Sequence, residues 1–331
     1  MREFFINNYY TQSVVLADEN TKKYCYPLIK QVLPKKHRFI QVKSGEENKN
    51  LSTCTQIWQQ LTDFQCDRNT LVINLGGGVI GDMGGFCAAT YKRGIDFIQV
   101  PTTLLAQVDA SVGGKLGIDF EGFKNHIGVF ELPAAIFMDT VFLKTLPEVE
   151  IRSGFAEIIK HCLIADATLW KKISQQEISE QNWSELVFHS VKIKENITKQ
   201  DPTEKGLRKI LNFGHTIGHA IESFCLSQPK RKVLHGEAIA AGMICETYLS
   251  VKKCKLAEVY LEQIEEFLFS TFGKIELKPN EIDQIVKLTL QDKKNKGGQI
   301  NCVLLENIGR PILDQPISNQ DIKEALEFYL S

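Results

Sequence analysis

The first half of the chain alternates short apolar runs with stretches of helical periodicity. Five apolar runs predict buried strands, at residues 13–18, 38–42, 70–75, 96–101 and 135–139. Residues 45–66 lie between two of these runs and carry apolar side chains at helical spacing. Strands that alternate with helices are typical of a parallel sheet covered by helices. We therefore predict an α/β domain over residues 1–147.

The pattern changes after Pro147, where glycines become less frequent and long amphipathic stretches follow. These stretches predict helices at 151–165, 179–199, 207–224, 236–252, 256–272 and 280–291. Near the end of the chain, Ser318 has the position of a helix N-cap, with Asp321 at the capping-box position. We predict a mostly α-helical second domain over residues 148–331.

The composition argues against several classes of protein but does not indicate a function. The net charge is -1 with acids and bases spread throughout, so nothing indicates a surface for nucleic acid. The nine cysteines include no C-x-x-C pair and are typical of reduced, buried thiols. The N-terminal "MREFFINNYYTQ" lacks the apolar core of a signal peptide, and glycines interrupt the most apolar window, at 71–91. We expect a soluble cytoplasmic protein without a membrane span.

A glycine-rich loop directly follows the predicted strand at 70–75. In "TLVINLGGGVIGDMGGF", Gly76, Gly78 and Gly81 satisfy the pattern G-x-G-x-x-G, and a helix is expected from Asp82 onward. Such a loop lets backbone N–H groups and a helix N-terminus approach a diphosphate, as in dinucleotide sites. The alternative is a tight turn with close packing. Spacing nominates Asp96 as an acidic ribose ligand, but Asp96 opens the next strand, so we do not assign it that role.

Two further segments combine lysines with glycines. Lys115 stands between "SVGG" and "LGID", where exposed backbone beside a cation suits an anionic ligand, although a solvated loop has the same composition. Lys293 and Lys294 precede a glycine pair and are, taken alone, typical of a solvated basic loop. These patterns leave binding and solvent exposure as open alternatives.

Metal-ligating side chains concentrate in three segments of the second half. "GFAEIIKH" offers Glu157, "GHTIGHAIE" offers His215, His219 and Glu222, and "LHGEAIAAGM" offers His235 and Glu237. A catalytic zinc site usually takes three protein ligands and leaves one position open. His215 and His219 share a helical face, but "HTIGH" lacks the glutamate of the zinc-protease motif H-E-x-x-H. Spacing alone leaves metal binding, acid–base chemistry and plain burial open for this pair.

Taken together, the motifs resemble the 3-dehydroquinate synthases, a branch of the sugar-phosphate cyclase family. The matching segments are "GGGVIGDMGGFCAATYKRGI", "PTTLLAQVDASVGGK", "KNHIG", "GFAEIIKH", "LNFGHTIGHAIE", "HGEAIAAGM" and "DKKNKGG", in the family's order. The resemblance implies a Rossmann-like NAD-binding domain, a helical domain that binds metal and substrate, and an active site in the cleft between them. It also implies a homodimer.

The resemblance implies roles for individual residues. Glu157, His215 and His235 would hold a zinc or cobalt ion, with His219 facing the substrate. The catalytic and substrate-binding set would be Arg93 (across the dimer interface), Asp109, Lys115, Lys124, Asn125, Lys160, Lys194, Glu204, Arg208, Asn212, His219 and Lys294. The NAD set would be Glu46, Lys49, Gly76, Gly77, Gly78, Asp82, Thr102, Thr103, Asp109, Lys115, Lys124 and Thr145.

The implied reaction converts 3-deoxy-D-arabino-heptulosonate 7-phosphate to 3-dehydroquinate and phosphate. NAD would remove a hydride and return it, phosphate would be eliminated, and an aldol closure would follow, so the enzyme would be a lyase of aromatic amino-acid biosynthesis. Two anionic groups on the substrate account for many convergent cations in a near-neutral chain.

Three other functions compete with this one. A cyclase of the same family that acts on sedoheptulose phosphate or glucose 6-phosphate usually alters the lysine, asparagine and histidine set, which is intact here. A glycerol-dehydrogenase-type enzyme would release NADH and usually has aspartate where Glu157 stands. A non-enzymatic NAD-binding protein would have no need of three metal ligands.

Overall fold

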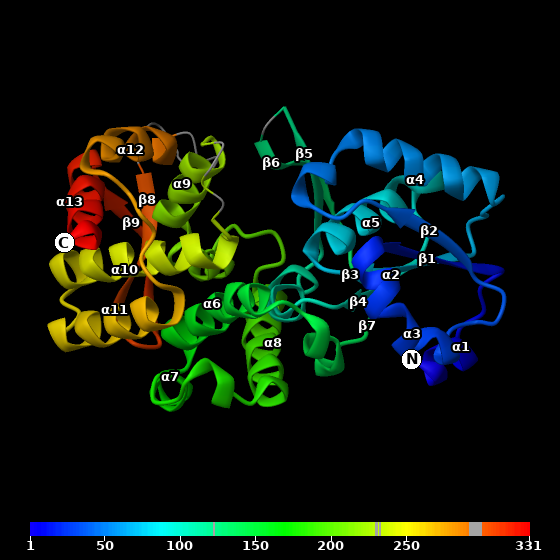
Figure 1. Cartoon of the computed structure of the whole chain (residues 1–331), viewed down its shortest axis with the longest axis horizontal. Helices are drawn as coiled ribbons and strands as arrows, with labels where there is room; N and C mark the ends of the chain where they lie inside the picture. Colours follow the sequence, from blue (N-terminus) through cyan, green and yellow to red (C-terminus); the bar gives the residue numbers. More distant parts are fainter. Residues whose placement is uncertain (122, 229–230, 232, 291–299) are drawn as a thin grey trace. The chain divides into compact units, whose positions relative to one another are not determined.

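In the computed structural model of the chain, five strands of the first half form one sheet in the order β2-β1-β3-β4-β7 (Figure 1). All four neighbouring pairs are parallel, which confirms the predicted fold class. The strands are β1 (Gln12–Asp18), β2 (Arg38–Val42), β3 (Thr70–Gly76), β4 (Phe97–Pro101) and β7 (Ala135–Ile136). Each of them overlaps one of the five apolar runs.

Side chains that alternate along the strands build a core on each face of this sheet. In β1, Val14 and Leu16 belong to the core that packs under the helices α4 (Leu51–Asp63) and α5 (Gly78–Thr90). Val15 and Ala17 point to the other face, whose core includes side chains from α3 (Tyr26–Ile29). The remaining helices of this half are α1 (Arg2–Asn7) and α2 (Glu19–Tyr24). The fold is therefore a parallel sheet with helices on both faces.

Two features of the first half differ from the sequence prediction. Helix α5 begins at Gly78 and not at Asp82, so the glycine loop itself contributes the first helical turn. The polar segment after β4 contains an antiparallel hairpin, β5 (Lys115–Phe120) and β6 (Phe123–Phe130), where we predicted no strands. Its glycines and lysines concealed the alternation that normally marks a strand.

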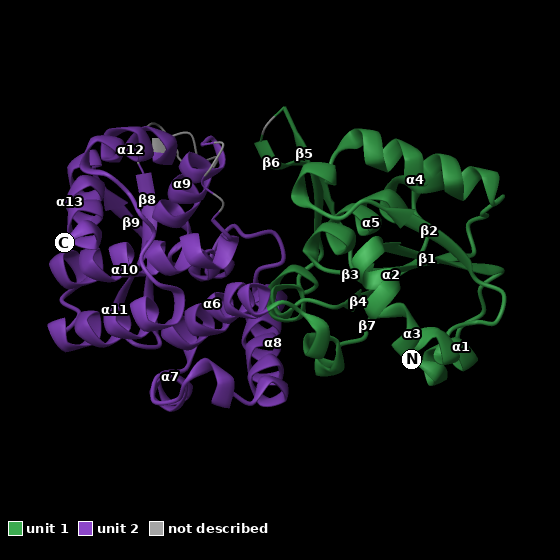
Figure 2. Cartoon of the chain, in the orientation of Figure 1, with its two compact units in different colours: residues 1–147 green, residues 148–331 purple. Residues whose placement is uncertain are grey.

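The structure describes residues 1–121, 123–228, 231, 233–290 and 300–331, and it separates into two compact units, Met1–Pro147 and Glu148–Ser331 (Figure 2). The second unit is mostly helical, as predicted. Its helices are α6 (Glu148–Ala165), α7 (Ala167–Ile173), α8 (Trp183–Gln200), α9 (His215–Leu226), α10 (His235–Cys254), α11 (Glu258–Phe272), α12 (Ile282–Leu290) and α13 (Asn319–Leu330). Helix α10 contacts α6, α9, α11 and α13 and is the central helix of the unit.

Three details of the second unit bear on the predictions. The predicted capping box is confirmed, because Ser318 Oγ accepts from Asp321 N and Asp321 accepts from Ser318 N. The hairpin β8 (Ile300–Asn307) and β9 (Arg310–Ile317) was not predicted. The predicted helix over 207–224 is wrong as a single element: a 3₁₀ helix, η7 (Leu207–Asn212), ends before Gly214, whose φ of 80° interrupts the chain before α9.

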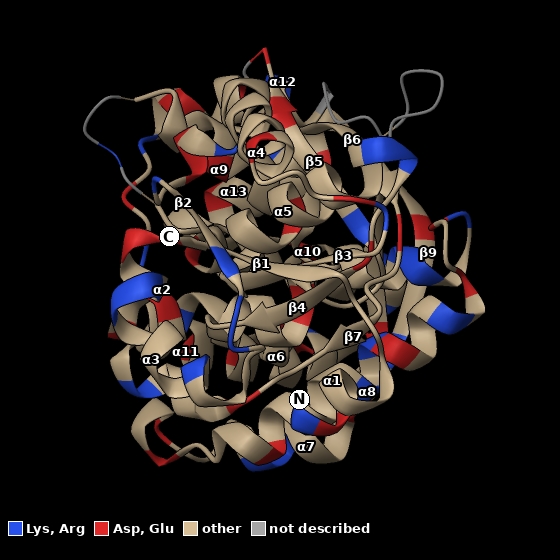
Figure 3. Cartoon of the chain, turned by 90° about the vertical axis from the view of Figure 1, so that its right-hand side faces the viewer, with Lys and Arg blue, Asp and Glu red and all other residues tan. Residues whose placement is uncertain are grey.

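Among the described residues, no helix is long and apolar enough to cross a membrane. All nine cysteines are thiols without a disulfide, and eight of them are buried. Lysines and arginines are interspersed with acidic residues along the helices and loops drawn in Figure 3, in keeping with the near-zero net charge.

Candidate active site

Three helices of the second unit bring the predicted metal ligands together. Glu157 lies in the middle of α6, His215 is the first residue of α9, and His235 is the first residue of α10. One ligand atom from each of these residues lies within 4.8 Å of the other two. The Nε2 atoms of His215 and His235 lie 3.5 Å and 3.8 Å from the same oxygen, Glu157 Oε1. Side chains far apart in sequence therefore converge on one point.

In both His215 and His235, the Nδ1 atom faces a hydrogen-bond acceptor. This contact determines whether Nε2 is free to bind a metal. His215 Nδ1 lies 3.1 Å from the carbonyl oxygen of Phe213, which can only accept. His235 Nδ1 lies 3.4 Å from Glu222 Oε2. When Nδ1 carries the proton, Nε2 keeps the lone pair that binds a metal. Two lone pairs and a carboxylate oxygen that face one another form a donor set that fits a divalent cation such as zinc.

The carboxylates around His235 stabilise a positive charge at this position. Glu157 is 0% exposed, and its partner Lys160, one turn along α6, is 1% exposed. Burial lowers the pKa of His235, but the hydrogen bonds and charges of Glu157 and Glu222 outweigh burial and raise it to about 9. Two carboxylates at one imidazole therefore attract a cation, whether a proton or a metal ion.

A second group of potential ligands shares one member with the first. His219, Glu222 and His235 also place one ligand atom each within 4.8 Å of the others. The ring centroids of His215 and His219 are 5.0 Å apart, as expected for one face of α9. Glu237, the remaining candidate on α10, accepts from Leu234 N at 2.8 Å and caps the helix, so we do not assign it to the metal. The geometry leaves two possible triads around His235.

The predicted anion-binding groups of the second unit come from α8 and η7, which both contact α6. Lys194 in α8 and Arg208 in η7 are buried, and Arg208 Nη1 donates to the carbonyl oxygen of Pro202 at 2.6 Å. Asn212 Nδ2 donates to Glu204 Oε1 at 2.7 Å. A continuous helix over 207–224 would place Arg208, Asn212 and His215 on one face, but the break at Gly214 separates η7 from α9.

In the first unit, the glycine loop lies at the carboxyl end of β3. A Cβ atom on Gly76 would come within 2.5 Å of Ile80, and one on Gly77 within 2.9 Å of Thr103, so neither position accepts a side chain without a shift. Thr102 N donates to Gly76 O at 3.0 Å, which places Thr102 and Thr103 beside the loop. No side chain caps the start of α5 at Gly77. The N–H groups of its first turn can therefore serve an anion.

A buried lysine joins three of the other predicted residues of this unit. Lys49 Nζ lies 2.7 Å from Asp82 Oδ2 and donates to Asn125 Oδ1 at 2.6 Å. Burial opposes the charge on Lys49, but Asp82 and Glu46 outweigh it and raise the pKa of Lys49. The resemblance placed Asn125 with the substrate, whereas this structure places it beside two residues of the predicted NAD set.

The remaining predicted residues come from several separate elements of the chain. Lys115 and Lys124 are exposed on the β5–β6 hairpin, and Asp109 lies in a π-helical turn (Ala106–Ala110). Glu46 is exposed, and Thr145 ends a 3₁₀ helix (Thr140–Thr145). Lys294 and its neighbour Lys293 lie outside the described residues.

Arg93 stands in an unusual turn at the surface. It is exposed, and Lys92, Arg93 and Gly94 all have positive φ, at 51°, 70° and 110°. Positive φ is costly for residues other than glycine and often marks a functional position.

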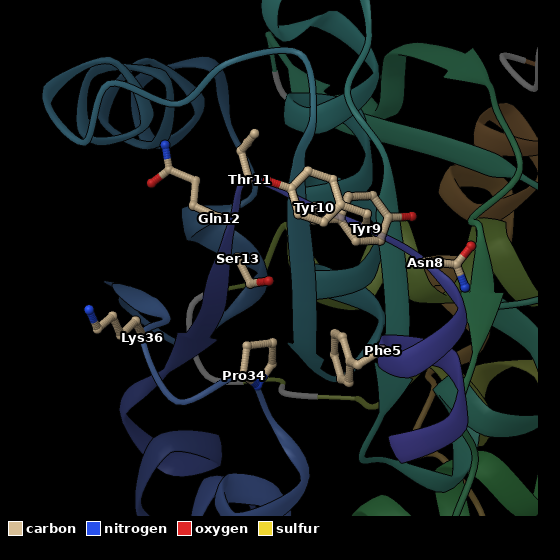
Figure 4. Close-up of a pocket in the computed structure, with 9 residues that line it drawn as sticks. All are labelled: Phe5, Asn8, Tyr9, Tyr10, Thr11, Gln12, Ser13, Pro34 and Lys36. Carbon is tan, nitrogen blue, oxygen red and sulfur yellow. The ribbon is translucent and has the colours of Figure 1, made fainter.

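A cavity of about 360 Å³ in the first unit lies at the opposite edge of the sheet from the glycine loop (Figure 4). Gln12 and Ser13, at the amino end of β1, line it together with aromatic side chains from the N-terminal segment. Gly76 ends the parallel strand β3, so the loop is at the carboxyl edge. Asp96, whose Oδ2 accepts from Tyr10 OH at 2.9 Å, also precedes its strand. Neither the cavity nor Asp96 belongs to the predicted nucleotide site.

Comparison with known proteins identifies the family. A family model described as 3-dehydroquinate synthase N-terminal matches residues 39–153, and one described as 3-dehydroquinate synthase C-terminal matches residues 154–295. The chain belongs to the 3-dehydroquinate synthase family. A 3-dehydroquinate synthase of Parabacteroides distasonis is 42% identical over 99% of this chain and 94% of its own length. One of Campylobacter concisus is 41% identical over 87% of this chain and 82% of its own length.

A solved structure extends the likeness to a related cyclase. The 2-deoxy-scyllo-inosose synthase complexed with carbaglucose-6-phosphate, NAD⁺ and Co²⁺ matches with a TM-score of 0.84. It is 25% identical, and the match covers 96% of this chain and 91% of that one. The family and the fold predicted from the motifs are thereby confirmed.

One buried carboxylate of the second unit was missed by the sequence analysis. Glu246 in α10 is 0% exposed and accepts from the backbone at the start of α9. A single charged residue within the mostly apolar run "AIAAGMICETYLS" is the signal that could have revealed it, because a carboxylate is seldom fully buried unless it has hydrogen-bonding or charged partners.

Proposed function

We propose that this chain converts 3-deoxy-D-arabino-heptulosonate 7-phosphate to 3-dehydroquinate and phosphate. The observation that carries the proposal is the match of both halves of the chain to the 3-dehydroquinate synthase family. The convergence of Glu157, His215 and His235 supports it independently, because the chemistry requires a polarised hydroxyl and these side chains can hold a divalent ion.

We assign the metal to Glu157, His215 and His235, with zinc or cobalt as the ion, and we assign His219 to the substrate. The assignment is favoured over the triad of His219, Glu222 and His235 by the direction of the rings. His215 and His235 both turn Nε2 toward Glu157, while His235 turns Nδ1 toward Glu222. Glu222 then acts as the carboxylate that orients a metal-binding histidine. When bound, the ion would lower the pKa of a substrate hydroxyl, and NAD would accept and return a hydride.

Around the metal ion and NAD, residues of this chain would bind and orient the substrate and transfer protons. Lys160, Lys194 and Arg208 are buried cations on neighbouring elements, suited to a substrate with a carboxylate and a phosphate. Asn212, next to Glu204, offers an amide for substrate hydroxyls. His219 has an ionisable ring close to the metal ligands and is the candidate to hold or move a proton at its imidazole.

In the first unit, we assign NAD to the carboxyl edge of the sheet. Gly76, Gly77 and Gly78 allow the diphosphate to approach the uncapped start of α5. The Lys49–Asp82 pair and the two threonines after β4 would surround the rest of the dinucleotide.

We further propose that the active form of the protein is a homodimer in which Arg93 contributes to the active site of the partner subunit. The support is the conformation of this residue, which is exposed on a turn with three successive positive φ angles. A surface arginine held in a costly backbone conformation is suited to bind a group that belongs to another subunit.

A substrate comparison tests the proposed function. The purified protein should release phosphate from the heptulosonate phosphate and form 3-dehydroquinate, with little turnover of sedoheptulose 7-phosphate or glucose 6-phosphate. Preferential turnover of either competing sugar phosphate would move the chain to another branch of the cyclases.

Metal analysis of three variants tests the ligand assignment separately. Glu157→Ala and His235→Ala should lose bound metal, whereas His219→Ala should keep its metal and lose turnover. Loss of metal in the His219 variant would favour the second triad and refute our assignment.

A further inference from the structure

Glu246 is a buried carboxylate that belongs to neither possible triad of metal ligands. It lies in α10, is 0% exposed, and accepts hydrogen bonds from the backbone at the start of α9. Its Oε2 accepts from Gly214 N at 2.7 Å, and its Oε1 accepts from Thr216 N and Ile217 N at 3.0 Å and 3.2 Å. Gly214 and Thr216 lie directly on either side of His215, the first residue of the helix.

The start of α9 has no cap of its own. The N–H groups of the first helical turn lack partners within the helix, and a side chain at the N-cap usually satisfies some of them. Here the N-cap is Gly214, which has no side chain and whose φ of 80° turns the chain into the helix. Glu246 supplies from a neighbouring helix the acceptor that Gly214 lacks. Its negative charge also suits the positive end of the α9 dipole.

Close packing of the two helices fixes where this acceptor stands. A Cβ atom on Gly242, one turn before Glu246, would lie 1.9 Å from Gly214 O and 2.6 Å from Gly218 N. The backbones of α9 and α10 therefore touch at Gly242, and the carboxylate of Glu246 has little freedom to move relative to the first turn of α9. The contact with α10 therefore fixes the position of the backbone around His215.

We propose that Glu246 is a positioning residue that holds the first turn of α9 so that the imidazole of His215 faces Glu157. The inference rests on the proposed metal assignment, since it concerns the placement of one of its ligands. Residues that orient a metal ligand typically change metal affinity by 10–100-fold when they are removed. A purely structural role would instead lower stability and leave the affinity of the folded protein unchanged.

The test compares two variants of Glu246 with two reference variants. Glu246→Ala removes all three acceptor contacts, whereas Glu246→Gln keeps a carbonyl oxygen for Thr216 N and Ile217 N but places an amide near Gly214 N. Ser250→Ala is the matched control, because Ser250 is equally buried in α10 and its hydroxyl accepts from Leu305 N and donates to the backbone oxygen of Glu246, without a bond to α9. His215→Ala defines the loss of a ligand.

The metal-free proteins are titrated with Co²⁺, and the visible absorption and the Kd are measured alongside thermal unfolding. We expect Glu246→Ala to bind Co²⁺ about 10–100-fold more weakly, with a shifted spectrum, and Glu246→Gln to lie between it and the wild type. Ser250→Ala should be destabilised yet bind Co²⁺ within about twofold of the wild type, because it removes the hydroxyl's hydrogen bonds to Leu305 N and Glu246 O but keeps the carboxylate of Glu246 at the first turn of α9.

The outcomes separate the two proposals. Wild-type affinity in folded Glu246→Ala, or an equal loss in Ser250→Ala, would overturn the positioning role. If Glu246→Ala does not fold, Glu246→Gln decides, and an affinity and spectrum equal to those of the wild type would overturn it. Undiminished Co²⁺ binding by His215→Ala would show instead that the metal assignment is wrong.

Discussion

Gly242→Ala changes no proposed ligand, yet we predict that it abolishes tight metal binding. The added Cβ would lie 1.9 Å from Gly214 O, whereas ordinary contacts begin at 3.4 Å, so α9 and α10 must separate by about 1.5 Å (3.4 minus 1.9). Metal–ligand distances tolerate only about 0.2 Å. The separation therefore exceeds this tolerance several-fold, and His215 and His235, which begin these two helices, can no longer converge on Glu157.

The expected loss of stability follows from overpacking in a closely packed core. Such substitutions cost about 1–3 kcal/mol or somewhat more, and in a unit of this size 1 kcal/mol lowers Tm by about 2–4 °C. We therefore expect the Tm of metal-free Gly242→Ala to fall by about 6–12 °C if the cost is about 3 kcal/mol. In the wild type, metal at 100 times its Kd should add about 2.7 kcal/mol.

Thermal unfolding with and without Zn²⁺ provides the assay. The wild type should gain about 5–11 °C from the metal, and Gly242→Ala should gain almost nothing. Gly273→Ala is the control, because Gly273 is exposed with φ of 73° and has nothing within 4 Å of an added Cβ. It should lose about 1 kcal/mol from backbone strain and keep the full metal effect. A metal-induced shift in Gly242→Ala equal to that of the wild type would refute the reasoning.

Three further predictions concern other parts of the chain. Lys49→Met leaves Asp82, which is half-buried, without its cation and should destabilise the protein by about 3 kcal/mol and weaken NAD binding in a fluorescence titration; unchanged affinity would remove this pair from the nucleotide site. Mixed Arg93→Ala and Lys160→Ala proteins should recover part of the activity if Arg93 acts on the partner's site, and no recovery despite subunit exchange would contradict this. Burial raises the pKa of Cys25 from 9.0 to about 11, so the unfolded thiol ionises first and the stability from this thiol is lost between pH 9 and 11; Cys25→Ala should flatten that slope in urea unfolding.

The sheet could be predicted from the sequence because its inner strands β1, β3 and β4 are buried at nearly every position and are rich in apolar residues. The run "TLVINL" contains no charged residue and only two polar ones, Thr70 and Asn74, and β3 is buried at every position. The hairpins β5–β6 and β8–β9 escaped prediction for the opposite reason. Most residues of β6 are exposed, and β8 and β9 pair with shifts in register, so neither shows a regular alternation.

The candidate site could be predicted only in part. The helical spacing of His215 and His219 correctly indicated a shared face, and the resemblance named Glu157 and His235 as their companions. The apolar pattern of residues 207–224 did not reveal the helix break at Gly214. Apolar residues before and after this glycine follow the same helical spacing. The role of Glu246 depends on contacts between helices, which no local pattern encodes.

Phosphate release, followed together with NADH absorbance and with or without a chelator, tests the central claim most directly. We expect release of phosphate from 3-deoxy-D-arabino-heptulosonate 7-phosphate with catalytic NAD and no net NADH. The chelator should abolish release, and added Zn²⁺ or Co²⁺ should restore it. Stoichiometric accumulation of NADH, or phosphate release that persists after complete removal of metal, would contradict the account.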